Sequence, residues 1–234
     1  MTSAPVASGT RHAETKSPGS IPAPANRNLR LSKRILDLTM ASLALALLSP
    51  VLLTAALLIK VTSPGPVLSR QTRIGQAERP FAMLKLRTMH VGGDDRVHRE
   101  LNKRELLGDP SARASDGIYK QQHDPRVTAI GRFLRRFSID ELPQLFNVLI
   151  GDMSLVGPRP SLPWEVELFS TEQRRRHHCL PGITGLWQVS GRNALSMVEM
   201  LKLDIEYSER QSLTLDFWIL LRTPYVVLFD RGAR

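Results

Sequence analysis

The chain has 234 residues, of which 42% are hydrophobic, so it is long enough for one ordinary domain together with a membrane segment. Lys and Arg number 32 against 22 Asp and Glu, and the resulting charge of +10 predicts an anionic partner: nucleic acid, a phosphorylated substrate or an acidic lipid surface. The single cysteine, Cys179, excludes a disulfide within the chain and is compatible with a cytoplasmic catalytic part.

The first 28 residues are rich in Ser, Pro, Ala, Thr and Gly and show no apolar period. Such a segment cannot bury enough surface to offset the entropy lost on ordering. Residues 1–28 are therefore predicted to be a disordered tail.

Residues 35–59 are almost entirely apolar. As a straight helix they would measure about 37 Å at about 1.5 Å per residue, which is enough to cross a hydrocarbon core of about 30 Å. Two features complicate a simple span. Ser49-Pro50 lies near the middle, where proline removes a backbone donor and bends a helix. Basic residues also occur on both flanks, whereas a span usually has them on one side. A bent single-pass anchor and a broken helix that returns to the same side both fit the residues.

After a turn at Ser63-Pro64-Gly65-Pro66, residues 67–86 are predicted to form a β-hairpin whose turn lies around Gly75 to Arg79. Residues 90–124 are polar and are predicted to be a surface insertion with one helix.

The C-terminal half reads as mainly helical. Helical patterns cover 127–150, ending at Gly151, and 161–178. Loops are expected from about 181 to 192, followed by helices at about 195–210 and 213–229. The aromatic residues Trp187, Tyr207 and Trp218 are expected to serve packing or the membrane interface.

Adjacent carboxylates at Asp140 and Glu141, followed by Pro143, form the first candidate site. If a helix begins near Leu142, its amides would lie close to the acids and suit a bound phosphate. An aspartate in such a place can attack phosphorus. The alternative is structural, because Ser138 with Glu141 also matches a helix capping box.

Basic residues surround this acidic pair in the sequence. Arg132, Arg135 and Arg136 precede it, Arg159 follows it within Gly157-Pro158-Arg159-Pro160, and Lys85 and Arg87 end the second predicted strand. The planar fork of arginine suits the charge of a diphosphate during phosphoryl transfer.

Taken together, these segments resemble the bacterial sugar transferases, the monotopic phosphoglycosyl transferases that start exopolysaccharide and O-antigen repeat units. The resemblance runs from about Lys33 to the C-terminus. It rests on the following segments: KRILD (33–37), Ser49-Pro50, GPV (65–67), KLRTM (85–89), DPRVTAIGRFLRRFSIDELPQLFNVLIGDMSLVGPRP (124–160), PGITGLWQVSGR (181–192) and SLTLDFWILLRT (212–223). The stand-alone undecaprenyl-phosphate galactose phosphotransferases of exopolysaccharide pathways look most similar.

The resemblance implies that Asp140 is the nucleophile, Glu141 is its partner, and both hold Mg²⁺. Asp140 would attack the β-phosphate of a UDP-sugar, release UMP and form a covalent phosphosugar adduct, which undecaprenyl phosphate then accepts. Lys85, Arg135, Arg159 and Arg87 map to substrate binding. The transferred sugar would be a hexose, galactose or glucose, and the step would be the first membrane step of exopolysaccharide or O-antigen synthesis.

The fold class implied is α+β and mainly helical. A broken, re-entrant membrane helix (29–62, broken at Ser49 and Pro50) would be followed by a compact cytoplasmic catalytic domain (63–234) with a small β-hairpin. The expected location is the bacterial inner membrane, with the catalytic domain on its cytoplasmic face. Membrane lipid is an expected partner, nucleic acid is not, and self-association remains open.

Two other functions are compatible with parts of the sequence. A membrane-tethered nucleic-acid-binding protein would fit the basic pI, but no helix-turn-helix or aromatic RNA motif is present. An inactive scaffold of a polysaccharide assembly complex would keep the fold alone, and the intact Asp140-Glu141 pair argues against it.

Overall fold

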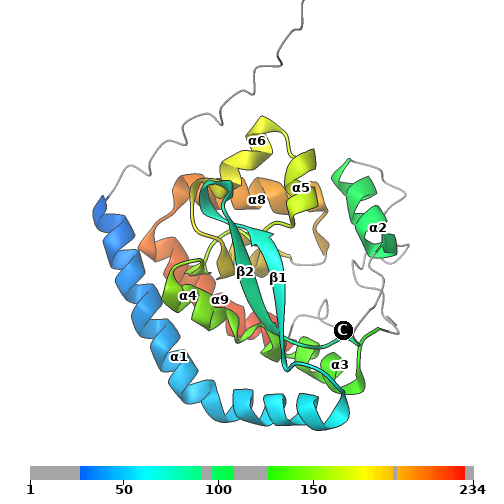
Figure 1. Ribbon diagram of the computed structural model, residues 1–234. Coiled ribbons are helices and arrows are strands. Elements are labelled where there is room, and N and C mark those ends of the chain that lie inside the picture. Colours follow the sequence, from blue (N-terminus) through cyan, green and yellow to red (C-terminus); the bar gives the residue numbers. More distant parts are fainter. Residues whose placement is uncertain (1–26, 91–95, 108–125, 192–193, 230–234) are drawn as a thin grey trace, which may run out of the picture.

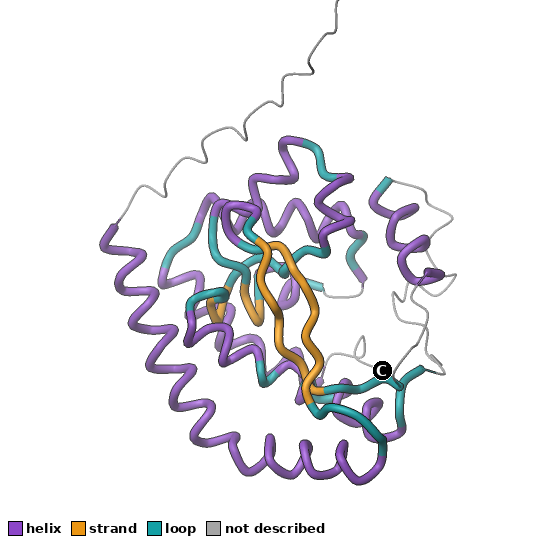
Figure 2. Tube along the Cα trace, in the orientation of Figure 1, coloured by secondary structure: helices purple, strands orange, loops and turns teal. Residues whose placement is uncertain are grey.

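The computed structural model describes residues 27–90, 96–107, 126–191 and 194–229. Helices predominate in this part of the chain and surround a central antiparallel hairpin (Figures 1 and 2). The elements in chain order are α1 (Arg27–Thr62), β1 (Leu68–Ile74), a 3-10 turn at Gln76–Glu78, β2 (Pro80–Leu86), α2 (Arg96–Leu106), α3 (Ala129–Arg136), a 3-10 turn at Ile139–Glu141, α4 (Gln144–Ile150), β3 (Ser154–Val156), α5 (Pro163–Leu168), α6 (Thr171–Arg174), a 3-10 turn at Arg175–His178, β4 (Gly182–Thr184), α7 (Leu186–Ser190), α8 (Met197–Arg210) and α9 (Leu213–Phe229).

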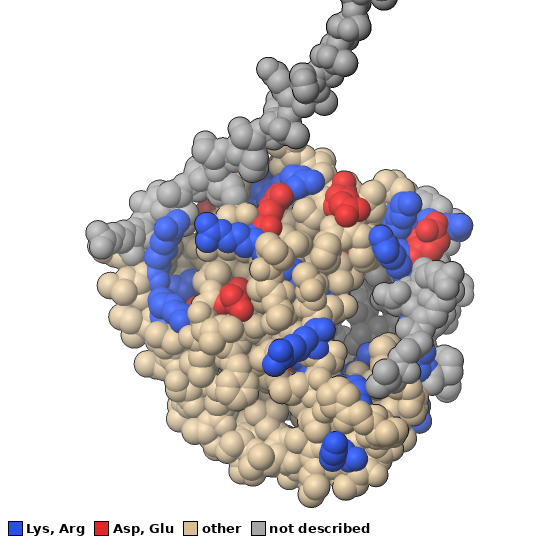
Figure 3. Space-filling model, in the orientation of Figure 1, with Lys and Arg blue, Asp and Glu red and all other residues tan. Residues whose placement is uncertain are grey.

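Helix α1 is longer than the apolar run that predicted it. Among the described residues it is the one helix that is long and apolar enough to cross a membrane. Only 11% of its most apolar stretch is buried against the rest of the molecule. Figure 1 shows that α1 bends along its course. Large apolar side chains such as Leu43, Leu47 and Leu53 are exposed on it, and Figure 3 shows an uncharged surface along the lower left border, where α1 runs.

The Ser49-Pro50 pair lies inside α1 rather than ending it. Proline has no amide to donate to the carbonyl four residues earlier, which is that of Ala46. The hydroxyl of Ser49 donates to this carbonyl at 2.9 Å. Ser49 therefore satisfies the acceptor that Pro50 leaves open, which matters most where no water can reach it.

Both ends of α1 are attached to the rest of the molecule. Near its start, Arg34 donates to the carbonyls of Val148 and Leu149 at 2.6 and 2.8 Å. Just past its end, Ser63 accepts hydrogen bonds from the guanidinium of Arg87. The two halves of the helix thus border one and the same body.

The predicted hairpin is confirmed. Strands β1 and β2 pair antiparallel in a register that joins Leu68 to Leu86 and Ile74 to Pro80. The turn between them contains Ala77 and Glu78, both with positive φ.

The region 127–150 is helical, as predicted, but it is interrupted. Ser138 adopts a left-handed conformation with φ 55°, which ends α3, and its side chain makes no capping bond. The capping-box alternative is therefore wrong. After the 3-10 turn, α4 begins at Gln144 and ends at Gly151, whose φ of 96° fits the predicted glycine cap.

The single helix predicted for 161–178 is wrong. The chain forms α5, α6 and a 3-10 turn there, because Phe169 is extended and Ser170 starts a new helix with its own capping box. The loops predicted for 181–192 are also wrong in part, since β4 and α7 lie within them. The helices predicted at about 195–210 and 213–229 are confirmed as α8 and α9.

A second, parallel sheet joins β3 and β4, which the sequence did not predict. Each strand has only three residues, too few for a detectable alternation. The strands approach so closely that a Cβ on Gly157 would lie 2.3 Å from the carbonyl oxygen of Leu180. The nearby Gly157–Pro160 loop is thus fixed by backbone contacts.

The main core gathers side chains from α1, β2, α4, β3, α7, α8 and α9. It encloses a polar cluster in which Lys33 Nζ lies 2.7 Å from Asp216 and also donates to Tyr207 and the carbonyl of Val156. This buried ion pair ties α1 to α9.

The predicted tail lies almost wholly outside the described residues, and the described part of the predicted insertion contains α2.

Candidate functional site

The Asp140-Glu141 pair lies in the 3-10 turn between α3 and α4, which packs against both α3 and β2. Asp140 is 7% exposed and Glu141 about one-third exposed. The pair does not sit at the start of a long helix, because α4 has seven residues and begins three positions later. The turn itself, and not the helix dipole, places these carboxylates.

Lys85 contacts one member of the acidic pair, Glu141, directly. Its Nζ lies 2.7 Å from Oε1 of Glu141, and the two side chains are 28% and 34% exposed. The contact joins the end of β2 to the acidic turn, so the structure brings together two sequence-predicted site residues that are 56 positions apart.

Arg135, at the end of α3, is bonded to the chain just beyond β2. Its Nε donates to Oγ1 of Thr88 at 2.9 Å, and it is half-buried. The ends of α3 and β2 and the acidic turn therefore place Lys85, Arg135 and the two carboxylates at one edge of the hairpin.

The acidic turn also contacts the apolar helix α1. Ile139, directly before Asp140, packs against a cluster formed by Ala55 and Ile59 of α1 with Leu86 and Leu134. The candidate nucleophile thus lies next to the second half of the apolar helix.

Arg159 is exposed, while two buried arginines hold the backbone of Arg159 and of the following Pro160. Arg176 donates to the carbonyl of Arg159 at 2.7 Å, and Arg73 donates to the carbonyl of Pro160 at 3.0 Å. Arg176 is itself paired with buried Asp204. The backbone of the loop is thus held in place, while the side chain of Arg159 remains accessible to solvent.

Arg73 is a site residue that the sequence analysis missed. It is 5% exposed, and among the described residues it forms no salt bridge; its guanidinium bonds to Gln71 and to the carbonyl of Pro160. Burial, and then the nearby charge of Arg159, lower the pKa of Arg73 from 12.5 to about 9. Glu165 and Glu141 act on this pKa in the opposite direction, so Arg73 feels the charge of Glu141 as well as that of Arg159.

A register argument would have found Arg73. Lys85 of β2 pairs with Ser69 of β1, so these two side chains lie on one face of the hairpin. Arg73 lies four residues beyond Ser69 in β1, and because side chains alternate along a strand, it lies on this face too. The predicted hairpin thus contained the signal.

Arg87 has a different set of contacts. It is 8% exposed, and its guanidinium donates to the carbonyls of Ser63 and Pro64 at 2.7 and 2.8 Å. These bonds hold the chain where it leaves α1. A role for Arg87 in substrate binding stays a prediction.

The carboxylates fit the Mg²⁺ that the resemblance implies. Magnesium usually binds through one or two carboxylates and completes its shell with water and substrate phosphates. Asp140 and Glu141 supply this number of ligands, and no cluster of three or more metal-binding side chains occurs in the described ranges. Magnesium binding at this pair stays a prediction.

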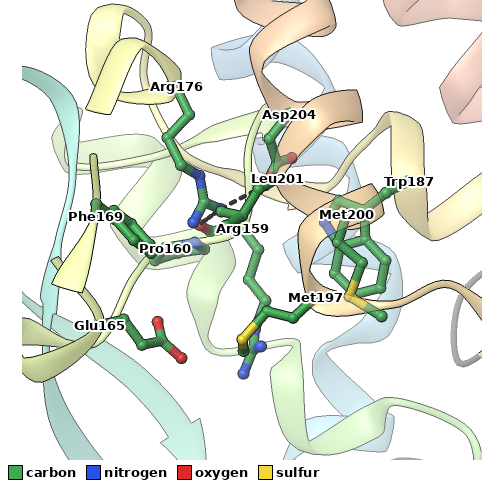
Figure 4. A pocket seen from close by; sticks show the side chains of 10 residues that line it. All are labelled: Arg159, Pro160, Glu165, Phe169, Arg176, Trp187, Met197, Met200, Leu201 and Asp204. Atoms are coloured by element: carbon green, nitrogen blue, oxygen red, sulfur yellow. Dashed lines mark hydrogen bonds and ion pairs between the residues drawn. The ribbon is translucent and has the colours of Figure 1, made fainter. Parts of the chain in front are cut away.

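A small cavity lies behind the Arg159 loop (Figure 4). Its enclosed volume is about 20 Å³, and its polar lining includes Arg159, Glu165, Trp187 and Asp204. Figure 4 shows the carboxylate of Glu165 and the guanidinium of Arg159 reaching into the same side of it. Neither Glu165 nor Trp187 was marked as a site residue by the sequence, because no local pattern distinguishes them from packing residues.

Comparison with known proteins gives a consistent result. Residues 28–230 match the family model described as bacterial sugar transferase. The UDP-glucose:undecaprenyl-phosphate glucose-1-phosphate transferase of Caulobacter vibrioides is 47% identical over 211 residues, which cover 87% of this chain and 72% of that protein.

Two further relatives differ in length. The exopolysaccharide production protein ExoY of Sinorhizobium fredii is 40% identical, with 87% of this chain and 88% of the relative covered. The undecaprenyl-phosphate galactose phosphotransferase of Salmonella typhimurium is 41% identical over 89% of this chain but only 43% of its own length. The chain thus spans most of some relatives and less than half of others.

Proposed function

Because the chain belongs to the bacterial sugar transferase family, we propose that it transfers a hexose-1-phosphate from a UDP-sugar to undecaprenyl phosphate and releases UMP. The enzyme class follows from the family and from relatives named as undecaprenyl-phosphate sugar-phosphate transferases. The relatives include both a glucose and a galactose enzyme, so the proposal covers either hexose.

One observation carries the proposal for this chain. The acidic turn that holds Asp140 packs, through Ile139, against the apolar helix α1. A water-soluble nucleotide sugar and a lipid phosphate can react with the same group only if that group lies near the membrane surface. The contact between the turn and α1 supports this placement.

The reaction is proposed to have two steps. A carboxylate oxygen of Asp140 attacks the β-phosphorus, the bond from this phosphorus to the bridging oxygen breaks, and UMP departs. A phosphate oxygen of the lipid then attacks the same phosphorus, and the bond to Asp140 breaks to regenerate the carboxylate. Each step exchanges one P–O bond for another, so no oxidant or further reactant is needed.

The basic side chains bind and orient the diphosphate. Lys85 is held by Glu141, which directly follows the proposed nucleophile in the chain, and Arg135 of α3 is bonded to Thr88 just beyond β2. Arg159 extends from its rigid loop and suits a two-pronged bond to phosphate oxygens. When Mg²⁺ is bound by Asp140 and Glu141, it neutralises part of the diphosphate charge.

We also propose that α1 is re-entrant, with both of its ends on the cytoplasmic face of the inner membrane. Arg34 and Ser63, at opposite ends of the helix, both bond to the same body, which supports this topology over a single pass. Exposed apolar residues of helices that contact α1, such as Phe146 and Ile150 on α4, extend the surface available to lipid.

The topology has a direct test. Arg30→Cys and Lys60→Cys, made separately, place an exposed thiol near each end of α1, and the native Cys179 is buried and serves as background. Both thiols should react with a membrane-impermeant reagent in inside-out vesicles and neither in intact spheroplasts. Labelling of one end from each side would overturn re-entrance.

The function is tested by incubating the full chain, in membranes or detergent, with undecaprenyl phosphate and a panel of UDP-sugars. UMP and a lipid-linked sugar should form with UDP-glucose or UDP-galactose. Failure to release UMP from any UDP-sugar of the panel, with a folded protein, would favour the scaffold alternative.

A further inference from the structure

The cavity behind Arg159 is lined by buried polar atoms that have no bonding partner. Oε1 of Glu165 and Nε1 of Trp187 are buried, and neither forms a hydrogen bond among the described residues. Glu165 is 4% exposed. A buried carboxylate oxygen without a donor is costly, so a group that donates to it is expected in this cavity.

The second oxygen of Glu165 has a structural role. Oε2 accepts a hydrogen bond from the amide of Leu162 at 2.7 Å and so caps the start of α5. The cap fixes the carboxylate of Glu165, which lines the cavity together with Arg159 (Figure 4).

The lining selects the chemistry of the ligand. The lining holds two carboxylates, those of Glu165 and Asp204, and two guanidinium groups, those of Arg159 and Arg176, so it has no net charge that would select an ionic group. A hydroxyl group is small and uncharged and has a proton to donate, so it can satisfy the acceptor Glu165. The enclosed volume of about 20 Å³ accommodates one water-sized group rather than a sugar ring.

We propose that this cavity is a specificity subsite in which Glu165 accepts a hydrogen bond from one hydroxyl group of the transferred hexose. The inference rests on the proposed function, since it assigns a part of that substrate to a place beside its reaction centre.

The nucleotide sugar carries hydroxyl groups on the hexose and on the ribose, and the two-step reaction favours the hexose. UMP must leave so that the lipid phosphate can take its place, which requires an open site. The phosphosugar stays attached between the two steps. A fixed, buried acceptor suits the part of the substrate that remains.

The test variant is Glu165→Gln. Its remaining carbonyl oxygen can keep the bond to Leu162, whereas an NH₂ donor can replace the acceptor that faces the cavity. Glu167→Gln is the matched control, because Glu167 lies on the same helix and is exposed. Met200→Phe, from the opposite wall, is a second variant that reduces the cavity without touching the cap.

The assay measures kcat/KM for the UDP-hexose that the enzyme uses and for its four monodeoxy analogues, together with inhibition by UMP. Glu165→Gln should lower kcat/KM for the complete sugar by about tenfold or more, as expected for a hydrogen bond to a charged group. For one deoxy analogue the variant and the native enzyme should be equal. Inhibition by UMP, and all values for Glu167→Gln, should stay within about twofold of native. Met200→Phe should also lower kcat/KM for the complete sugar.

Three results would overturn the inference. Weaker inhibition by UMP in Glu165→Gln would assign the hydroxyl to ribose. Unchanged kinetics would leave Glu165 as a capping residue that bonds to resident water. Equal losses of kcat/KM for all four analogues would show that the cavity binds no hydroxyl group of the hexose. If Glu165→Gln does not fold, Met200→Phe takes its place, and unchanged kinetics in that variant would decide against the subsite. In each case the native enzyme would still release UMP, so the proposed function would stand.

Discussion

Lys85 Nζ lies 2.7 Å from Glu141 Oε1, and this ion pair joins the end of strand β2 to the turn that holds Asp140. The pair is about one-third exposed, so solvent weakens it as a stabilising contact. Its value is positional: it holds a cation beside the carboxylate that is proposed to attack phosphorus.

Replacing Lys85 by Gln should therefore reduce turnover more than stability. We expect kcat to fall by about tenfold or more, because a charged donor to the diphosphate is lost, while the unfolding temperature changes little. Steady-state UMP release and thermal denaturation measure the two effects. Lys103→Gln, an exposed lysine on α2, is the control. A native kcat in Lys85→Gln would remove this residue from the site.

Arg159 is expected to act on the nucleotide sugar, because its exposed side chain extends from a loop fixed by Arg73 and Arg176. Arg159→Ala should lower kcat/KM for the UDP-sugar by about tenfold or more. Arg79→Ala removes an exposed arginine elsewhere on the hairpin and should have no effect. Equal kinetics in the two variants would contradict the assignment.

The buried Lys33–Asp216 pair is expected to hold α1 against the catalytic body. Lys33→Met would leave the Asp216 carboxylate buried without its cation, and breaking such a pair typically costs about 3–5 kcal/mol. The variant should unfold at a clearly lower temperature in detergent than Arg30→Ala, which removes an exposed charge three residues earlier. Similar unfolding temperatures for both variants would argue against the tie.

Buried His177 predicts a pH dependence of stability. Burial, followed by the charges of Arg176 and Arg174, lowers its pKa from 6.5 to about 3. Between these values the unfolded chain binds a proton that the folded chain excludes. The stability that His177 contributes is therefore complete above pH 6.5 and is lost as the pH falls toward 3, at about 1.4 kcal/mol per unit.

The measurement is the fall in unfolding temperature from pH 7.5 to pH 5.5, compared between the native chain and His177→Gln. The fall should be larger in the native chain. Burial raises the pKa of Asp204 from 3.8 to about 6, so its contribution to stability changes in the opposite direction between pH 3.8 and 6. Asp204 is present in both proteins, and its effect therefore cancels in the comparison. Parallel curves would show that His177 titrates alike in the folded and unfolded chains.

The sequence predicted those parts of the fold that have long local patterns. The hairpin, α8, α9 and the apolar helix each repeat a clear period over many residues. The three-residue strands β3 and β4 could not be predicted, because their pairing depends on contacts between segments some 28 positions apart. The division of 161–178 into short helices depends on Ser170, whose capping signal was hidden within an apparently continuous apolar face.

The same distinction applies to the site. The acidic pair and Lys85 were candidates from the residues themselves, the resemblance assigned their roles, and the structure joins Lys85 to Glu141 in an ion pair. Arg73 was missed although the hairpin register places it on the face of Lys85, whereas Glu165 was missed because its burial in the cavity beside Arg159 leaves no local pattern.

The central claim is that Asp140 carries the phosphosugar between the two half-reactions. The full chain is incubated with a UDP-hexose labelled with ³²P at the β-phosphate, without lipid acceptor, and then denatured. The native protein should retain the label and release it on prior addition of undecaprenyl phosphate, whereas Asp140→Asn should retain none and release no UMP. Full turnover and undiminished labelling of Asp140→Asn would contradict the account.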